Sequence, residues 1–341
     1  MTIKPTNFDW LNLTVEETLE PELPICDPHH HLWDSRSDRA SQRYLLDEIL
    51  ADVTSGHNVV STVFIECGSM YRSSGPDNLK PVGETEFVNG IAAMSASGLY
   101  GKPRVAAGIV GLADLMFGDA VGPVLDAHIA AGGGRFRGIR HRACWDPSKD
   151  VPNSQPTTIQ DLYLNDQFRE GFATLAPRNL SFEGWCYHPQ IPQLADLARA
   201  FPETTIILNH FGGPLGIGPY KGKQDDYFPA WKNAITDLAK CPNVVAKLGG
   251  LAMEINGFDW HMKQRPPSSL ELMEATRRFY EHVIEQFGPK RCMFESNFPV
   301  DKVSCSYNVL WNSFKRLTAN YSDTEKADLF HDTANRVYRL G

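Results

Sequence analysis

The chain lacks the features that mark membrane-spanning, nucleic-acid-binding and secreted proteins. It contains no run of about 18 apolar residues, so we expect no transmembrane helix. Its formal net charge is −8, and its lysines and arginines form no basic stripe, so we expect neither a nucleic acid nor a membrane as partner. The first residues, Met1–Asn7, lack the apolar core of a signal peptide.

Disulfide and zinc-knuckle signatures are also missing. The seven cysteines are odd in number and scattered, and no two of them form a Cys-x-x-Cys pair. Several lie inside apolar runs that resemble strands. A reduced interior accounts for such cysteines better than disulfides do, so we expect a cytoplasmic protein.

The chain does contain a repeated alternation of strand-like and helix-like segments. At 341 residues, with 42% hydrophobic and 22% charged residues, it can bury a large core. The predicted strands are short apolar runs: Pro24–His31, Val59–Cys67, Arg104–Leu112, Phe136–Arg142, Ser181–His188, Thr204–His210, Asn243–Gly249 and Arg291–Phe298. The predicted helices include Glu84–Ser97, Leu194–Phe201, Tyr227–Lys240, Ser269–Phe287 and Asp323–Leu340, the last opened by a capping box at Ser322 and Glu325.

Eight strands that alternate with helices predict a closed (β/α)₈ TIM barrel of the α/β class rather than an open doubly wound sheet. The phosphate-binding fingerprint of the open sheet is absent, because Gly132-Gly133-Gly134 precedes a strand instead of following one. We find no linker that would divide the chain. We therefore expect an N-terminal extension over residues 1–22 and a single barrel domain over residues 23–341.

Three predicted connections on the C-terminal side of strands are too long to be simple turns: Gly68–Gly83, Gly212–Tyr227 and Met253–Ser269. Long loops at this end of a barrel usually cover the active site, so we expect them to form a lid. The third loop carries Phe258, Trp260, His261, Lys263 and Arg265, which suit an anionic or planar substrate. A structural flap or an oligomer contact is the alternative.

The most informative segment is Asp27-Pro-His29-His30-His31-Leu-Trp33-Asp34, at the end of the first predicted strand. Alternate side chains of a strand point to the same face, so His29 and His31 should converge while His30 points away. Two converging imidazoles can hold a metal ion or polarise a carbonyl. The alternative is a histidine-rich loop used only for packing.

Polar residues also follow most of the other predicted strands, and catalytic groups of a TIM barrel lie at this rim. They are Glu66, Arg137, Arg140, His141, Arg142, His188, Gln190, Asn209, His210, Lys247, Glu295, Ser296, Asn297 and Asp301. Any one of them alone could cap a helix. Their convergence on one rim is hard to explain by packing.

Five motifs together resemble the amidohydrolase superfamily, specifically the amidohydrolase-related branch that contains sugar-lactone and pyrone-dicarboxylate lactonases. They are the Asp27–Asp34 run, Arg137-Gly-Ile-Arg140, Leu208-Asn-His210-x-Gly212, Lys247-Leu-Gly249 and Phe294-Glu-Ser-Asn-Phe-Pro299. The resemblance extends from about Ile25 to the C-terminus. It implies a TIM-barrel hydrolase that opens a cyclic ester of a carboxylated or polyhydroxylated molecule, although some relatives decarboxylate unsaturated or aromatic acids.

The resemblance also implies roles for individual residues. His29, His31 and His210 either ligate one divalent metal ion, with zinc expected, or activate the scissile carbonyl without any metal. Arg140 matches the family region that binds a substrate carboxylate. A guanidinium suits this role because it can donate two parallel hydrogen bonds to a carboxylate. His188, Gln190 and Lys247 are further candidates for substrate binding.

The chain departs from the family pattern at the eighth strand. Family members commonly have Ser-Asp-x-Pro there, and the aspartate serves as general base or metal ligand, whereas this chain has Asn297. An amide cannot take up a proton at useful pH, so Asn297 can only ligate a metal or orient a water. Asp301 is a candidate replacement base, with helix capping as its alternative role. Glu66 and Glu295 are weaker candidates.

Three hypotheses follow for the function. The leading one is a lactonase-type hydrolase with a small anionic substrate; the others are a metal-dependent decarboxylase on the same barrel and a non-catalytic binding barrel. The basic residues at the rim favour the anionic substrate. Relatives of this size often form homodimers, which we keep as an expectation for the assembly.

Overall fold

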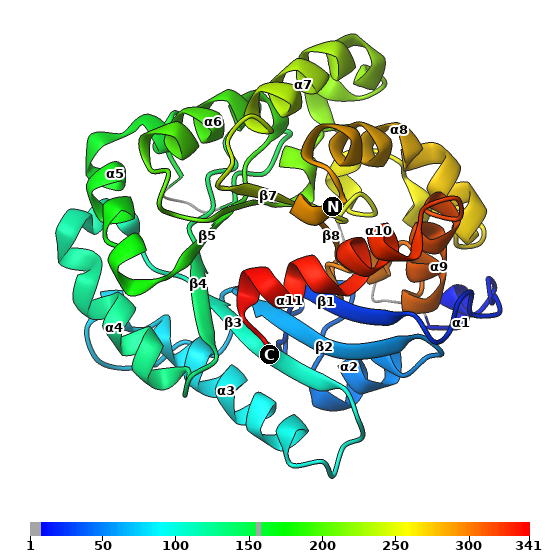
Figure 1. Ribbon diagram of the computed structural model, residues 1–341, viewed down its shortest axis with the longest axis horizontal. Coiled ribbons are helices and arrows are strands. Elements are labelled where there is room, and N and C mark those ends of the chain that lie inside the picture. The colour runs from blue at the N-terminus through cyan, green and yellow to red at the C-terminus, as the bar shows by residue number, and fades with distance from the viewer. Residues whose placement is uncertain (1–7, 155–157) are drawn as a thin grey trace.

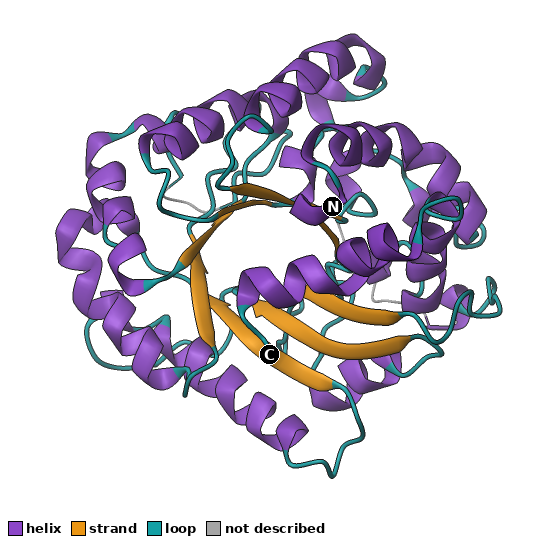
Figure 2. Ribbon diagram, viewed as in Figure 1, coloured by secondary structure: helices purple, strands orange, loops and turns teal. Residues whose placement is uncertain are grey.

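The computed structural model describes residues 8–154 and 158–341, and it is a barrel of eight strands enclosed by helices (Figure 2). The strands are β1 (Pro24–His30), β2 (Asn58–Ile65), β3 (Arg104–Gly111), β4 (Phe136–Arg140), β5 (Ser181–Gly184), β6 (Ile206–Leu208), β7 (Val244–Leu248) and β8 (Cys292–Phe294). They are hydrogen-bonded in sequence order, and each neighbouring pair is parallel. The predicted TIM barrel is therefore confirmed.

The barrel closes where β1 meets the segment that follows β8. The backbone N–H of His31 donates to the carbonyl of Phe298 at 2.8 Å, and the N–H of Asn297 donates to the carbonyl of His29 at 2.9 Å. Asp27 reinforces this seam, because one carboxyl oxygen accepts from the N–H of Ser296 at 3.0 Å. The histidines of the first strand and the segment around Asn297 are thus joined through the backbone.

Helices cover the outer face of the barrel (Figure 1). They are α1 (Phe8–Leu11), α2 (Leu46–Val53), α3 (Val82–Ala96), α4 (Gly122–Ala131), α5 (Asp166–Ala173), α6 (Ile191–Ala200), α7 (Gln224–Leu238), α8 (Ser269–Phe287), α9 (Tyr307–Leu317), α10 (Asp323–Ala327) and α11 (Thr333–Tyr338). The bounds of α8 agree with the sequence prediction. The predicted helix Asp323–Leu340 is instead divided into α10 and α11 by a π-helical turn over Asp328–Asp332.

The predicted strands ran one to four residues too far at their C-terminal ends. The fifth, for example, ends at Gly184 instead of His188, and the eighth ends at Phe294 instead of Phe298. The polar residues at these ends leave the sheet because the chain turns there into the loops that surround the rim. The alternation of apolar and polar residues in the sequence continues past the last residue that is hydrogen-bonded in the sheet. A prediction based on that alternation therefore makes the strand too long.

Three apolar clusters of buried residues stabilise the barrel, and the smallest lies among the rim loops around Trp185 and Leu215. The largest lies between the strands and the surrounding helices. The second fills the interior of the barrel, where Val63, Val110 and Ile207 pack against Tyr338 and Leu340 of the C-terminal segment. The segment that ends the chain, with α11, therefore lies across one opening of the barrel (Figure 1).

Arg137 belongs to this closed end and not to the catalytic rim expected from the sequence. Its guanidinium donates to the carbonyls of Tyr338 and Gly134. Side chains alternate along β4, so Arg137 and Arg140 leave the strand in different directions. Arg137 thus holds the C-terminal segment in place.

The N-terminal segment packs against the loop before α8, the start of α8, and α9. The indole N–H of Trp10 donates to the carbonyl of Lys263 at 3.0 Å, and Glu16 accepts from the N–H of Ser269 at 2.7 Å. The predicted extension over residues 1–22 lies partly in residues 1–7, outside the described ranges. Within the described part of the chain, no helix has the length and apolar character needed to cross a membrane.

Tyr338 gives a test of how strongly the C-terminal segment supports the barrel. Its hydroxyl donates to the fully buried Glu183 on β5. Tyr338→Phe leaves that carboxyl oxygen without this donor, so we expect the free energy of unfolding to fall by about 1–3 kcal/mol in urea denaturation. Tyr100→Phe, at an exposed site, is the control, and equal stability of the two variants would contradict the role given to Tyr338.

Candidate active site

A cavity of about 250 Å³ lies at the C-terminal ends of the strands. Its described lining consists of His31, Trp33, Arg36, Arg39, Cys67, Arg140, Arg142, Pro152, Asn153, Ser154, Trp185, Tyr187, His210, Met253, Ile255, Asn297 and Val300. A second cavity of about 230 Å³ shares Trp33, Arg39 and Val300 with the first, so the two form one continuous groove. Strand ends supply its floor, and the loops after β1, β4 and β7 supply its walls.

The three histidines of β1 separate as strand alternation requires. The rings of His29 and His31 lie 5.0 Å apart, whereas His30 turns away and its Nε2 lies 2.8 Å from the hydroxyl of Thr62. Burial lowers the pKa of His29 and of His31 well below the usual range, and the neighbouring cations Lys247 and Arg140 add to the effect. Burial therefore disfavours the charged form of both rings.

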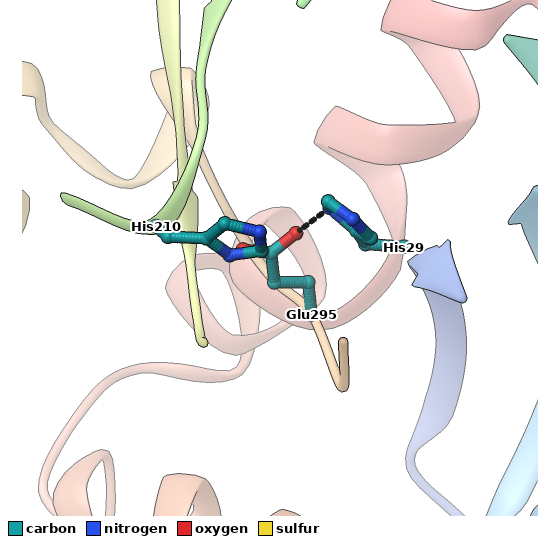
Figure 3. Close-up of side chains that lie close together, drawn as sticks. All are labelled: His29, His210 and Glu295. Atoms are coloured by element: carbon teal, nitrogen blue, oxygen red, sulfur yellow. Dashed lines mark ion pairs between the residues drawn. The ribbon is translucent and has the colours of Figure 1, made fainter. Parts of the chain in front are cut away.

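Glu295 lies between two imidazoles at the floor of the site (Figure 3). One carboxyl oxygen is 2.6 Å from Nδ1 of His29, and the other is 2.6 Å from Nδ1 of His210. Neither oxygen nor Nδ1 of His210 makes a hydrogen bond of good geometry, although all are buried. The ligand atoms of the three residues lie within 4.8 Å of one another, which fits a divalent cation.

This set differs in one member from the three histidines expected from the sequence. His31 is engaged elsewhere: its Nδ1 lies 2.8 Å from the carbonyl of Ile65, and its Nε2 lies 3.3 Å from Oδ1 of Asn297. Glu295 takes its place among the grouped ligands. Strand alternation offered a signal for this, because Glu295 and Asn297 lie two positions apart in the same way as His29 and His31.

Two glycines after β7 make room for this arrangement. A Cβ on Gly250 would lie 2.2 Å from Nδ1 of His210, and a Cβ on Gly249 would lie 2.2 Å from the carbonyl of Glu295. The backbone of the site is itself unusual, because His210 and Asn297 have φ values of 50° and 56°. Non-glycine residues in this region are often found at functional sites, where surrounding contacts hold them.

Arg140 is partly engaged by protein groups. Its Nε donates to Oε1 of Glu66 at 2.7 Å, and its NH1 lies 3.4 Å from Nε2 of His29. Arg142 approaches the same Glu66 oxygen at 3.1 Å. Burial by itself raises the pKa of Glu66, but the two guanidiniums outweigh it and hold the pKa below the usual value. Glu66 is thus an ionised anchor for both arginines.

Lys247, a predicted substrate-binding residue, lies beneath His29. It is fully buried, and its Nζ is 2.9 Å from Oε2 of Glu183 and 3.5 Å from Nδ1 of His29. It is not among the cavity-lining residues given above. Its position places a positive charge below the histidines rather than in front of the substrate.

His188 and Gln190, also predicted to bind substrate, hold loops together. Gln190 accepts from the N–H groups of Trp145 and Tyr187 and donates to the carbonyl of Ala143. The ring of His188 stacks on Tyr227 with a centroid separation of 4.0 Å. Neither residue is in the cavity lining described above. Both lie behind it, where they hold the surrounding loops in place.

Asp301 is buried behind Asn297. One of its oxygens accepts from Nδ2 of Asn297 at 2.8 Å, and the other accepts from the N–H of Ala252 at 3.0 Å. Burial raises the pKa of Asp301 to about 8, although these two hydrogen bonds oppose the shift. The carboxyl reaches the cavity only through Asn297.

The sequence prediction missed the cations and aromatics that loops bring to the cavity. Arg36 and Arg39 come from the loop after β1, and Trp185 and Tyr187 follow the short strand β5. In contrast, the basic residues of the third long loop lie elsewhere: Arg265 pairs with Glu271 at 2.9 Å. Only Met253 and Ile255 of that loop line the cavity described above.

Comparisons with known proteins agree with this architecture. A family model described as "Amidohydrolase" matches residues 26–340. The chain is 34% identical over 339 residues to the protein y4mH of Sinorhizobium fredii, across 94% of this chain and 99% of that protein. It is 27% identical over 241 residues to an L-fucono-1,5-lactonase of Burkholderia multivorans, across 70% of this chain and 73% of the relative.

Among solved structures, the chain is similar to an amidohydrolase of Burkholderia multivorans crystallised with bound zinc. The TM-score is 0.69 at 23% identity, and the match covers 93% of this chain and 99% of that chain. At this identity the likeness supports the fold alone.

Zinc binding tests the grouped ligands directly. Glu295→Gln removes the carboxylate that lies between His29 and His210, so we expect the affinity for Zn²⁺ in a titration to fall by at least about tenfold. Glu254→Gln, at the rim of the groove, keeps the ligands intact and is the control. Equal zinc affinity of the two variants would exclude Glu295 as a ligand.

Proposed function

The chain belongs to the amidohydrolase family and is an amidohydrolase-type hydrolase, and on this premise we propose that it is a lactonase whose substrate carries a carboxylate. The reaction adds water to a cyclic ester and yields the open hydroxy acid. Similarity to an L-fucono-1,5-lactonase supports the ester chemistry. The carboxylate is our inference from the cavity of this chain.

The charge of the cavity carries the proposal. Four arginines line it, at positions 36, 39, 140 and 142, whereas the adjoining part of the groove contributes one acid, Glu254. Two carboxylates outside the lining pair with these four arginines: Asp38 with Arg36 and Arg39, and Glu66 with Arg140 and Arg142. The whole chain nevertheless has a net charge of −8. A positive cavity in a negative protein favours an anionic ligand, and guanidinium groups suit a carboxylate because they donate two parallel hydrogen bonds.

A guanidinium supplies the activation of the ester. Arg140 lines the cavity beside His31, and it is placed to polarise the scissile carbonyl and to stabilise the negative charge that develops on its oxygen. A divalent ion held by His29, His210 and Glu295 would supply Lewis-acid activation at the same floor. His29 itself acts from beneath, through its contact with Glu295.

His210 is our candidate for activating the water. When the ring proton is on Nδ1, which faces Glu295, Nε2 can accept a proton from a water in the cavity. If His210 held a metal ion through Nδ1, Nε2 would carry the ring proton and could not take up another. The oxygen of that water then bonds to the ester carbon, the ring C–O bond breaks, and the leaving alkoxide takes the proton from Nε2 of His210. Asn297 is placed to orient the water by hydrogen bonding.

A panel of lactones tests the substrate class. We expect hydrolysis, followed by acid release, for lactones that bear a carboxylate, with weaker turnover of neutral sugar lactones. Arg39→Gln should raise KM about tenfold for the acidic lactones and leave the neutral ones unchanged. Arg43→Gln, from the same loop but paired with Glu48 outside the cavity, is the matched control. Release of carbon dioxide from an unsaturated acid, without lactone opening, would favour a decarboxylase instead.

Gly250 tests the placement of His210. Gly250→Ala drives a Cβ against the imidazole, so we expect kcat for the best lactone to fall by about a hundredfold. Gly98→Ala is the matched control, because Gly98 has a similar φ of 78° but no atom within 4 Å of the position that its Cβ would take. Comparable kcat in both variants would show that His210 does not need this position.

A further inference from the structure

Three side chains form a row that runs from the cavity into the protein. His31 and Asn297 line the cavity, and Asp301 lies behind them, fully buried. We propose that Asp301 is a positioning residue, which holds the side-chain amide of Asn297 with its oxygen toward His31 and the cavity. This inference rests on the proposed lactonase function for its catalytic consequence, but not for its geometry.

Hydrogen bonds alone decide which end of the Asn297 amide faces the cavity. The oxygen and nitrogen ends of an amide have nearly the same shape, so packing does not distinguish them. Asp301 distinguishes the two ends, because one of its carboxyl oxygens accepts a hydrogen bond from Nδ2 of Asn297 at 2.8 Å. The ionised carboxyl offers only acceptors, so the end of the amide that it can hold is the Nδ2 end.

Asp301 is itself fixed from the opposite side. Its second oxygen accepts from the N–H of Ala252, which belongs to the loop after β7, at 3.0 Å. The backbone N–H of Asp301 also donates to the carbonyl of Asn297 at 3.2 Å. The carboxyl is therefore tied both to the neighbouring loop and to the turn that carries Asn297.

The orientation of Asn297 matters because of the way His31 is held. Nδ1 of His31 lies 2.8 Å from the carbonyl of Ile65, which can only accept, so Nδ1 carries the ring proton. Nε2 therefore carries a lone pair and faces Oδ1 of Asn297 at 3.3 Å, so two acceptors face each other and no hydrogen bond joins them. A reversed amide would instead donate to Nε2 and occupy its lone pair.

Asp301 thus determines which groups the cavity offers to the reaction. When Oδ1 points toward the cavity, Asn297 presents an acceptor to a water beside His31. When Nδ2 points toward the cavity, that acceptor is lost, and the lone pair on Nε2 of His31 is occupied by a hydrogen bond from Nδ2. A residue with no atom in the cavity lining would in this way control the step that activates water.

A reciprocal exchange tests the proposal. In Asp301→Asn, an amide whose oxygen stays on the N–H of Ala252 turns its NH2 group toward Nδ2 of Asn297, so two donors face each other and the amide of Asn297 is no longer held with its oxygen toward His31. In Asn297→Asp combined with Asp301→Asn, the new asparagine accepts from Ala252 and donates to the new aspartate. That aspartate then keeps an oxygen facing His31.

We expect Asp301→Asn to lower kcat by at least about tenfold with little change in KM, and the double variant to recover most of the loss. Asp52→Asn is the stability control, because Asp52 is a largely buried acid that pairs with Lys302 away from the cavity. It should lower the melting temperature and leave kcat unchanged. Unchanged kcat in Asp301→Asn, or a folded double variant as slow as Asp301→Asn, would overturn the proposal.

A second measurement separates this inference from the proposed function. If the wild-type protein opens no lactone, the lactonase proposal fails, and the side-chain amide signal of Asn297 in an ¹⁵N-labelled protein still tests the positioning. The signal is identified by its absence from the double variant. We expect Asp301→Asn to shift it and to speed its exchange with water; an unaltered signal would refute the role of Asp301.

Discussion

The site depends on one seam, where the last strand of the barrel returns to the first. Two backbone hydrogen bonds, His31 to Phe298 and Asn297 to His29, join these segments directly. Asp27 completes the seam, because its second oxygen accepts from the hydroxyl of Tyr307 at 3.0 Å. Segments far apart in the sequence therefore meet at the catalytic rim, and the site exists only when the barrel has closed.

Buried charged groups beneath the seam favour one arrangement of the closed barrel over others. Glu183 pairs with Lys247, and Tyr338 from the C-terminal segment donates to the same carboxyl. Removing one partner from such a group leaves an uncompensated charge in the interior, which is strongly unfavourable. Strands β5 and β7 and the end of the chain are thereby held in one arrangement, directly under His29.

Much of the fold could be predicted from the sequence because βα alternation is a local pattern. The convergence of His29 and His31 followed from the same period of two. The partners of Lys247 and Asp301 could not be predicted, since they come from distant strands and loops and depend on the closed barrel. Arg36 and Arg39 lie in a loop without periodicity, so no local pattern indicated that they reach the cavity.

The surroundings of position 297 suit an amide. Glu295 already lies between two imidazoles, and Asp301 lies immediately behind Asn297. A carboxylate at position 297 would face the buried carboxyl of Asp301, whose pKa burial already raises to about 8, and would raise it further. An asparagine keeps the hydrogen-bonding shape of an aspartate without adding to that repulsion. Its direction must then be set by a neighbour, and Asp301 is the residue in contact with it.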